Sequence, residues 1–239
     1  MNHTHSFTTL LKTEFTLILR DGNVIIFGII IPVAIMFVVG LLVPGQGLTA
    51  SFAGVASIGI LATGIMGIPV TLAQYRHDGV LKQFKVTPVN PAMLLAVDAL
   101  LEVFFVLLSA ALVACVAHFV FHVHIASAGR FVLIYLFNIF VIYSIGNLIG
   151  ALVPDIQTCN SVTTILYFPS LILSGTTIPF AMLPRALRII AELFPMTQTN
   201  LLLSSAALGV TGPYDFVRFG ILAAGAVICY AVSVKVFRW

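Results

Sequence analysis

Two carboxylates, Asp98 and Glu102, lie four residues apart in a long apolar segment and are the first candidates for chemistry in this chain. At that spacing two side chains share one face of a helix. Carboxylates at membrane depth are costly unless they are paired, hydrated or buried between helices. Two interpretations follow. In the first they have a functional role: they line the inner mouth of a pathway, or they anchor the helix predicted outside the bilayer through Arg76 or Lys82. In the second they lie in water at the depth of the lipid headgroups.

Three histidines form a second cluster of groups that could do chemistry. His118 and His122 are also four residues apart, and His124 follows closely. Two imidazoles can share a metal ion, but a site needs three or four ligands and no carboxylate is near in the sequence. The three cysteines are far apart and have no ligand spacing, which indicates packing residues. We therefore interpret the histidines as solvated side chains at the membrane boundary and predict no metal site.

The residue patterns of an ATP site or an enzyme are missing. A phosphate-binding loop requires a Gly-Lys pair, and the four lysines instead follow Leu11, Leu81, Phe84 and Val234. No Ser/His/Asp set and no helical His-Glu-x-x-His can be read. We expect no catalytic residue and no cofactor in this chain. The net charge is only +3 and no basic cluster stands out, so a nucleic-acid partner is not expected.

Composition predicts the elements that must hold these residues. The chain is 60% hydrophobic and 8% charged, which excludes an ordinary soluble domain. Its 239 residues can hold about six spans of roughly 20 residues each. The segments that predict spans are 24–43, 51–73, 92–119, 131–153, 158–174 and 216–234. We expect one all-α integral membrane domain over 1–239, a kink at Pro32, and no cleavable signal peptide.

An amphipathic helix is predicted before the first span, over residues 7–20. Phe7, Leu11 and Phe15 fall on one face, with Lys12 and Thr16 turned away. A helix of this kind lies on the membrane surface. The alternative is a frayed polar N-terminus.

The loop between spans two and three, residues 74–91, is the densest ionisable run of the chain. It contains Arg76, His77, Asp78, Lys82 and Lys85. Its apolar residues fall at helical spacing up to Pro88, which predicts a short amphipathic helix outside the bilayer. Such a helix suits contact with a soluble partner, and the alternative is an ordinary solvated loop.

The region 175–209, before the last span, is predicted to form short helices. Gly175 and Pro179 break the fifth apolar segment, and a helix near 184–194 is too short and too charged to span. A further brief helix ends near Gly209. We expect this region to dip into the interface or to re-enter the membrane.

Polar residues also interrupt the fourth apolar segment: Asn138, Tyr143, Ser144 and Asn147. They line a cavity or form hydrogen bonds between helices, and we favour the second interpretation.

The positive charges give the expected orientation. Six spans place both termini on one side, and assigning that side to the cytoplasm agrees with the positive-inside rule. The lysines and arginines expected on the cytoplasmic side are then Lys12, Arg20, Arg76, Lys82, Lys85, Lys235 and Arg238. Those expected on the outer side are Arg130, Arg185, Arg188 and Arg218.

This order of parts resembles the membrane subunit, or permease, of ABC-2 type exporters over nearly the whole chain. Four stretches carry the resemblance: Phe7–Arg20, Arg76–Val89, Leu173–Pro184 and Leu193–Thr197. The second is the most specific, since it is similar to the family's charged segment, a Gly-Thr-Leu-Glu motif and a Thr-Pro-Val ending. This chain departs there, because Val80 replaces the Thr and Lys82 replaces the acid.

The resemblance implies roles for particular residues. The cytoplasmic coupling helix that contacts a separate ATP-binding subunit would be formed by Arg76, His77, Asp78, Gly79, Val80, Leu81, Lys82, Phe84 and Lys85. Phe7, Leu11 and Phe15 would belong to a connecting helix, and Gly175 and Pro179 to an outer gate. ATP and Mg²⁺ would be bound by two copies of the partner subunit. A second permease copy, identical or homologous, and membrane lipid complete the expected partners in a bacterial or archaeal cell membrane.

Three classes of function were compared. The leading hypothesis is an ATP-driven exporter of an apolar or amphipathic substrate, such as a drug, antibiotic or lipid, and a polysaccharide or glycolipid exporter of the same family is the alternative. The residues that could line its pathway are Asp98, Glu102, Asn138 and Asn147. A secondary transporter or channel would have ionisable residues at several mid-span positions, whereas the two acids lie near one end of a span. A membrane enzyme would need clustered catalytic residues, and none is evident.

Overall fold

The computed structural model describes residues 3–20, 25–43, 45–78, 91–177, 180 and 183–236, and all regular elements in that part of the chain are helices. In chain order they are α1 (His3–Arg20), η1 (Ile26–Ile30), α3 (Ile31–Leu42), α4 (Gln46–Ala56), α5 (Ile58–Leu61), η2 (Ala62–Gly67), α6 (Ile68–His77), α8 (Pro91–Phe119), α9 (Ala128–Leu152), α10 (Ile156–Leu173), α11 (Arg185–Ala191), α12 (Pro195–Leu208) and α13 (Asp215–Val236). The all-α prediction is therefore confirmed.

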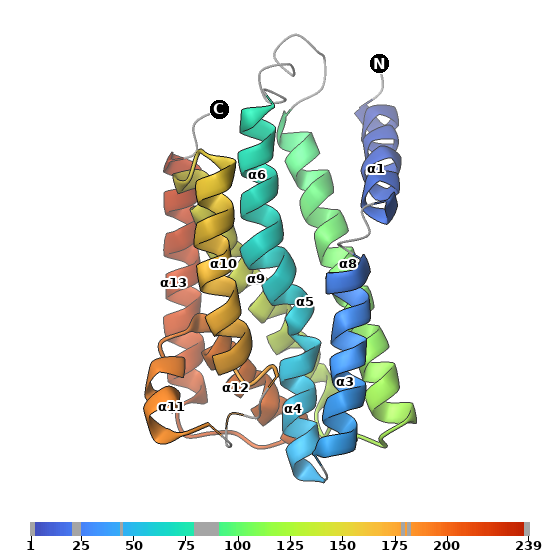
Figure 1. The fold of residues 1–239 in the computed structure, drawn as a ribbon, viewed down its shortest axis with the longest axis vertical. Coiled ribbons are helices and arrows are strands. Elements are labelled where there is room, and N and C mark those ends of the chain that lie inside the picture. Colours follow the sequence, from blue (N-terminus) through green and yellow to red (C-terminus); the bar gives the residue numbers. More distant parts are fainter. Residues whose placement is uncertain are drawn as a thin grey trace.

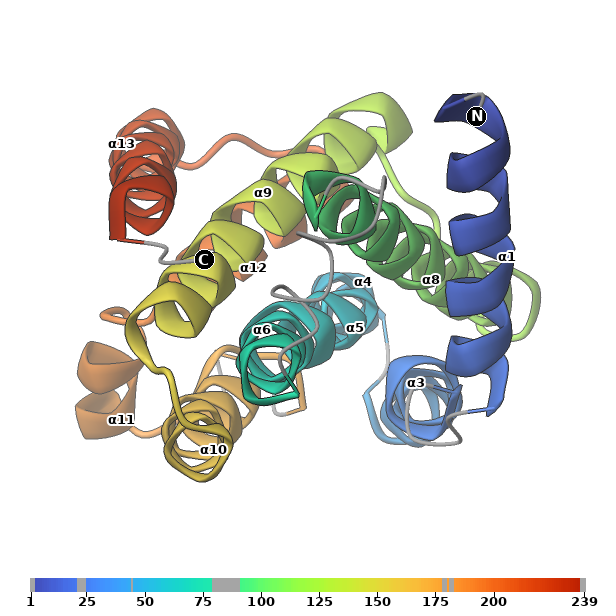
Figure 2. The ribbon, with the colours of Figure 1, turned by 90° about the horizontal axis from the view of Figure 1, so that it is seen from above.

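The long helices run side by side along the longest axis of the molecule (Figure 1). At the upper end of that view lie the start of α1, the end of α6, the start of α8 and the end of α13. At the lower end lie the start of α4 and the short helices α11 and α12. Seen from above, α1 is viewed from its side while α3, α6, α10 and α13 are viewed nearly end-on (Figure 2). Helix α1 is thus steeply inclined to the bundle, as a helix near a membrane surface would be.

Within the described residues, four helical stretches are long and apolar enough to cross a membrane: Gly47–His77, Met93–Phe119, Ala128–Leu152 and Asp215–Val236. The apolar helix Gly28–Leu42 is shorter, and α10 begins with the polar residues Gln157, Thr158 and Asn160. Helices occupy all six segments predicted to span. The chain is therefore a multi-pass membrane protein, and the count of six spans stays a prediction.

Two turns of π-helix each precede a proline. In η1 the N–H of Ile31 bonds to Ile26 O, and in η2 the N–H of Ile68 bonds to Thr63 O. Each of these two isoleucines, Ile31 and Ile68, is followed directly by a proline, Pro32 and Pro69. A proline ring clashes with the carbonyl four residues back and supplies no N–H, so the preceding turn widens to i→i−5 bonding. The structure therefore has a local distortion of the hydrogen bonding before Pro32, and the kink itself stays a prediction.

The second span is also broken at Ser57, where α4 ends and α5 begins. The N–H of Ser57 bonds to Gly54 O, and its hydroxyl bonds to Ala53 O at 2.8 Å. From α9, the Tyr135 hydroxyl donates to Ala56 O at 3.0 Å. Since these bonds occupy the carbonyls at the break, the interruption is stable in an apolar surrounding.

Small residues let α9 approach the second span closely. A Cβ on Gly146 would lie 1.9 Å from Gly64 O, and a Cβ on Gly150 would lie 2.8 Å from Leu72 Cδ1. In the second span, Gly54 and Gly64 allow close contacts of this kind. Gly59 and Gly67 have room for a methyl group. We call the contact of Gly64 with Gly146 and of Leu72 with Gly150 the glycine seam.

The short helices at the lower end differ from each other in burial. Helix α12 packs on α4 and α9, and its residues Leu203 and Ala206 are fully buried. Helix α11 is mostly exposed. Ile189 on this helix and Leu193 just after it lie on the surface, as do its arginines.

The second span begins earlier than predicted, because α4 starts at Gln46, directly after Gly45, which has a φ of +66°.

Candidate functional site

The upper end of the bundle gathers most of the residues singled out from the sequence. Arg76 and His77 are the last residues of α6, and Asp78 caps it, with its N–H bonded to Gln74 O. His77 Nδ1 lies 3.1 Å from Asp78 Oδ1, and both side chains are exposed. The other predicted coupling residues, Gly79, Val80, Leu81, Lys82, Phe84 and Lys85, lie outside the described residues, so their helix stays a prediction.

Arg76 points the other way, into the protein. Its guanidinium donates to Val153 O at 3.2 Å and to Gly150 O, at the C-terminal end of α9. The last carbonyls of a helix have no partner within it and carry partial negative charge. Arg76 thereby caps α9 from the end of α6.

Helix α10 starts at Ile156, three residues after the capped carbonyl of Val153. The Asp155 carboxylate accepts from the Thr158 N–H at 2.8 Å and from the Thr158 hydroxyl at 2.9 Å. These bonds hold the pKa of Asp155 below its usual range, because they stabilise the ionised form. Asp155 is the N-cap of α10 and fixes the direction in which the chain leaves the end of α9.

The acidic residues Asp98 and Glu102 lie on α8 beside α6 and η2. Asp98 Oδ2 accepts a hydrogen bond of 2.7 Å from the Tyr75 hydroxyl. The Glu102 carboxylate faces Gly67, since a Cβ there would lie 3.5 Å from Oε1. Arg76 was one expected anchor for these acids, but its described bonds go to α9, and the partner of Asp98 is Tyr75. Lys82, the other, lies outside the described residues.

Helix α1 brings a third acid to this end. Phe15 packs on Phe104 and Phe105 of α8, with ring centroids 6.4 and 5.8 Å away. Burial raises the pKa of the Glu14 carboxyl, and the negative charge of Asp98 raises it further. Phe7 and Leu11 are half-buried on the same helix. The predicted apolar face of α1 therefore turns toward α8.

The polar residues of α9 form hydrogen bonds within the bundle. Fully buried Asn138 donates to Ser57 Oγ at 3.4 Å, at the break in the second span. The Tyr143 and Thr63 hydroxyls are 2.9 Å apart. Asn147 donates to Tyr143 O and accepts from Ser233 of α13 through its backbone carbonyl. A role of Asn138 and Asn147 in a pathway stays a prediction.

The predicted gate region contacts the second span at the lower end. Gly175, at φ +80°, carries a carbonyl only 2.3 Å from where a Cβ on Gly54 would be. Asn200 of α12 donates to Ser174 O at 3.1 Å, and Ser204 donates to Ala50 O at 3.1 Å. Pro179 lies outside the described residues. The loop after α10 is thus packed between α4 and α12.

An ion-pair network at the lower end was not predicted from the sequence. Asp215, 4% exposed, lies 3.3 Å from Arg130 Nη2 and 3.6 Å from Arg218 Nη1. It also accepts from the Gly212 N–H at 2.9 Å. Arg130 donates further to Val210 O. The network ties the start of α9 to the loop before α13, and only the Asp215–Arg218 pair has a helical spacing that could have indicated it.

The α9 side of the glycine seam was not predicted, although α9 contains the signal Gly146-x-x-x-Gly150. This spacing puts two small residues on one face and allows close helix contact in membranes.

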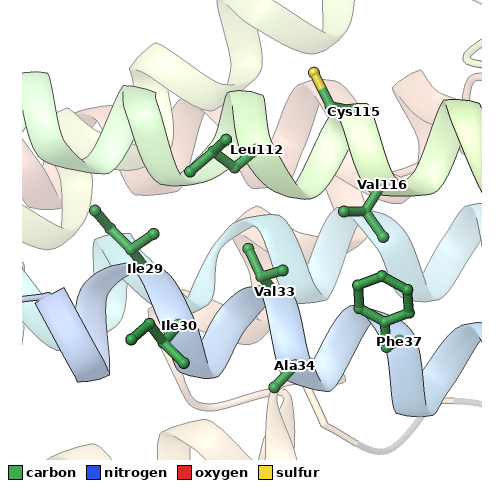
Figure 3. Close-up of a pocket in the computed structure, with 8 residues that line it drawn as sticks. All are labelled: Ile29, Ile30, Val33, Ala34, Phe37, Leu112, Cys115 and Val116. Atoms are coloured by element: carbon green, nitrogen blue, oxygen red, sulfur yellow. The ribbon is translucent and has the colours of Figure 1, made fainter.

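A groove of about 480 Å³ runs between α3 and α8 (Figure 3). All its lining residues are apolar or cysteine: Ile29, Ile30, Val33, Ala34, Phe37, Leu112, Cys115 and Val116. No group of three or more His, Cys, Asp or Glu residues in the described ranges could hold a metal ion. His118 and His124 approach each other, with ring centroids 5.8 Å apart. In the described part of the chain, the arrangement offers charged and polar contacts at the two ends and apolar surfaces between them.

Comparison with known proteins gives one family. A family model described as ABC-2 type transporter matches residues 5–207. A comparison with curated proteins found no match. The matched range extends from α1 to the last turn of α12 and includes every residue of the upper-end site.

Proposed function

The chain belongs to the ABC-2 type transporter family, and we propose that it couples to a separate ATP-binding subunit through residues 74–91 and exports an apolar or amphipathic substrate. Membership makes the chain a permease component of an ABC-type transporter, which is not itself catalytic and works with an ATP-binding partner. The family match over 5–207 is the observation that carries the proposal.

The position of the charged segment supports the docking role. Residues 74–91 connect the end of α6 to the start of α8, at the end of the bundle where α1 begins (Figure 1). His77 and Asp78 are exposed there. A partner that docks at this end could therefore contact both α1 and residues 74–91. Two copies of the partner and a second permease copy are proposed, with both termini cytoplasmic in a bacterial or archaeal cell membrane.

The proposed substrate class follows from the surfaces of the spans. The groove between α3 and α8 has an apolar lining (Figure 3), and the polar side chains Asn138 and Tyr143 bond within the bundle. A drug, antibiotic or lipid with a large apolar part suits such walls.

The test is co-purification with the candidate ATP-binding subunit, followed by substitution in the coupling segment. We expect Leu81→Asp or Phe84→Asp to uncouple ATP hydrolysis from transport, because a charge is placed on the apolar face that would enter the partner's groove. The membrane domain should remain folded. Unaltered transport in both variants would contradict the docking role.

A further inference from the structure

We infer that Arg76 is a positioning residue that fastens the start of the coupling segment to the end of α9, and that it is not a contact for the ATP-binding subunit. The inference rests on the proposed function, since it concerns how a push at residues 74–91 reaches the membrane helices. The inference gives Arg76 a role different from that of the other charged residues in 74–91, which are proposed to contact the partner.

The reason for the contact is a donor that α9 lacks. In a continuing helix the Gly150 carbonyl would accept from the N–H four residues later, but residue 154 is proline and has none. Arg76 donates to this carbonyl and to that of Val153. One guanidinium can reach two carbonyls because its donors form a planar fork.

Arg76 points into the protein, whereas its neighbours His77 and Asp78 are exposed to the surroundings. The side chains of His77 and Asp78 are 69% and 48% exposed, whereas Arg76 is half-buried and bonded to α9. Docking on a soluble partner requires exposed groups, which His77 and Asp78 provide. Arg76 is already committed to the protein interior.

The packing below Arg76 makes the fastening effective. The glycine seam leaves no space between α9 and the second span, with a Cβ on Gly150 only 3.1 Å from Pro69 Cα. Arg76 closes the upper end of this contact. Beyond it, Asp155 caps α10, so the end of α9 is joined to the start of α10 by a short, hydrogen-bonded connection. Movement of the end of α6 should therefore carry α9 and the start of α10 with it, as packed helices transmit rigid-body shifts.

The experiment measures distances between spin labels in the complex of the full chain with its ATP-binding subunit. In a background without the three native cysteines, one pair joins Gln74→Cys on α6 to Val38→Cys on α3. A second pair joins Gln157→Cys on α10 to the same reference. All three positions are exposed. Each pair is measured without nucleotide and after trapping with ATP and vanadate.

In the otherwise unaltered chain, we expect trapping to change both distances. In Arg76→Gln the Gln74 distance should still change, while the change at Gln157 should be smaller than in the unaltered chain, because the guanidinium bonds between α6 and α9 are gone and only the packing of the two helices remains. The matched control Lys235→Gln removes one positive charge from an exposed position at the same end and should change both distances as the unaltered chain does. Arg76→Lys keeps the charge and three N–H donors on one nitrogen but lacks the planar fork, so it should recover part of the Gln157 change.

Several results would overturn the inference. If Arg76→Gln no longer co-purifies with the ATP-binding subunit while Arg76→Lys binds fully, Arg76 is a docking charge. If both distances change in Arg76→Gln by as much as in the unaltered chain, the cap does not transmit motion. If nucleotide changes neither distance in the unaltered complex, the proposed function itself fails, and the inference fails with it.

Discussion

Replacing Gly146 by alanine should separate α9 from the second span. The new Cβ would lie 1.9 Å from Gly64 O, and under 3.0 Å something must shift. Gly64 O is a backbone atom, and the new Cβ is bonded directly to the backbone of residue 146. Neither atom can turn away, so the two helices must move apart by about 1 Å or more. Arg76 donates to Val153 O at 3.2 Å, near the outer limit of a hydrogen bond, and a shift of this size would break that bond as well. Overpacking of this kind costs about 1–3 kcal/mol.

The assay is the labelling rate of one buried thiol. Cys159 is fully buried on α10, so with Cys115 and Cys229 replaced by serine it reacts with maleimide only when this region opens. A loss of about 1–3 kcal/mol should raise its labelling rate roughly 5- to 150-fold in detergent. The control is Gly225→Ala on α13, where a Cβ meets nothing within 4 Å. This change should leave the rate equal or lower, because alanine favours a helix over glycine by about 1 kcal/mol. Equal rates in the two variants would refute the steric role of the seam.

Two further predictions concern charged groups at the two ends. Asp215→Ala should clearly lower the midpoint of thermal unfolding, because Arg130 and Arg218 lose a buried carboxylate partner. The loss of such a partner costs up to about 3–5 kcal/mol. An unchanged midpoint would show that the ion-pair network does not contribute to stability. Asp155→Ala should be less stable than the unaltered chain at neutral pH, since the N-cap bonds from Thr158 are lost. The folded pKa of Asp155 is depressed, so its stabilisation is complete above about pH 4 and disappears as the pH falls through the lower folded value. The difference between the two unfolding midpoints should therefore shrink in acid, and a difference independent of pH would contradict the role of the ionised cap.

The long elements could be predicted because apolar length is a direct signal of a membrane helix. Helices occupy every segment expected to span, and α1, α11 and α12 lie where short helices were expected. The π turns could not be located from the sequence, although Pro32 indicated one distortion. Asp215 and Arg130 are 85 positions apart, and no local pattern relates residues so distant.

The upper-end site was predicted in its residues but not in its contacts. The charged run around Arg76 and the pair Asp98 and Glu102 stood out by composition. Their partners did not, because neither the hydroxyl of Tyr75 nor a backbone carbonyl of α9 carries a sequence signal for these contacts. The GxxxG spacing at Gly146 was readable and could have located the seam.

The missing donor at Pro154 links two positions that are far apart in the chain. A residue with its own N–H at 154 could continue the ladder of α9 by one bond if Val153, now extended, became helical, and Gly150 O would then no longer depend on the arginine at 76. Proline there keeps the last turn of α9 dependent on a side chain from another helix. We therefore expect that, among related permeases, loss of one member of this pair is tolerated chiefly where the other has also changed.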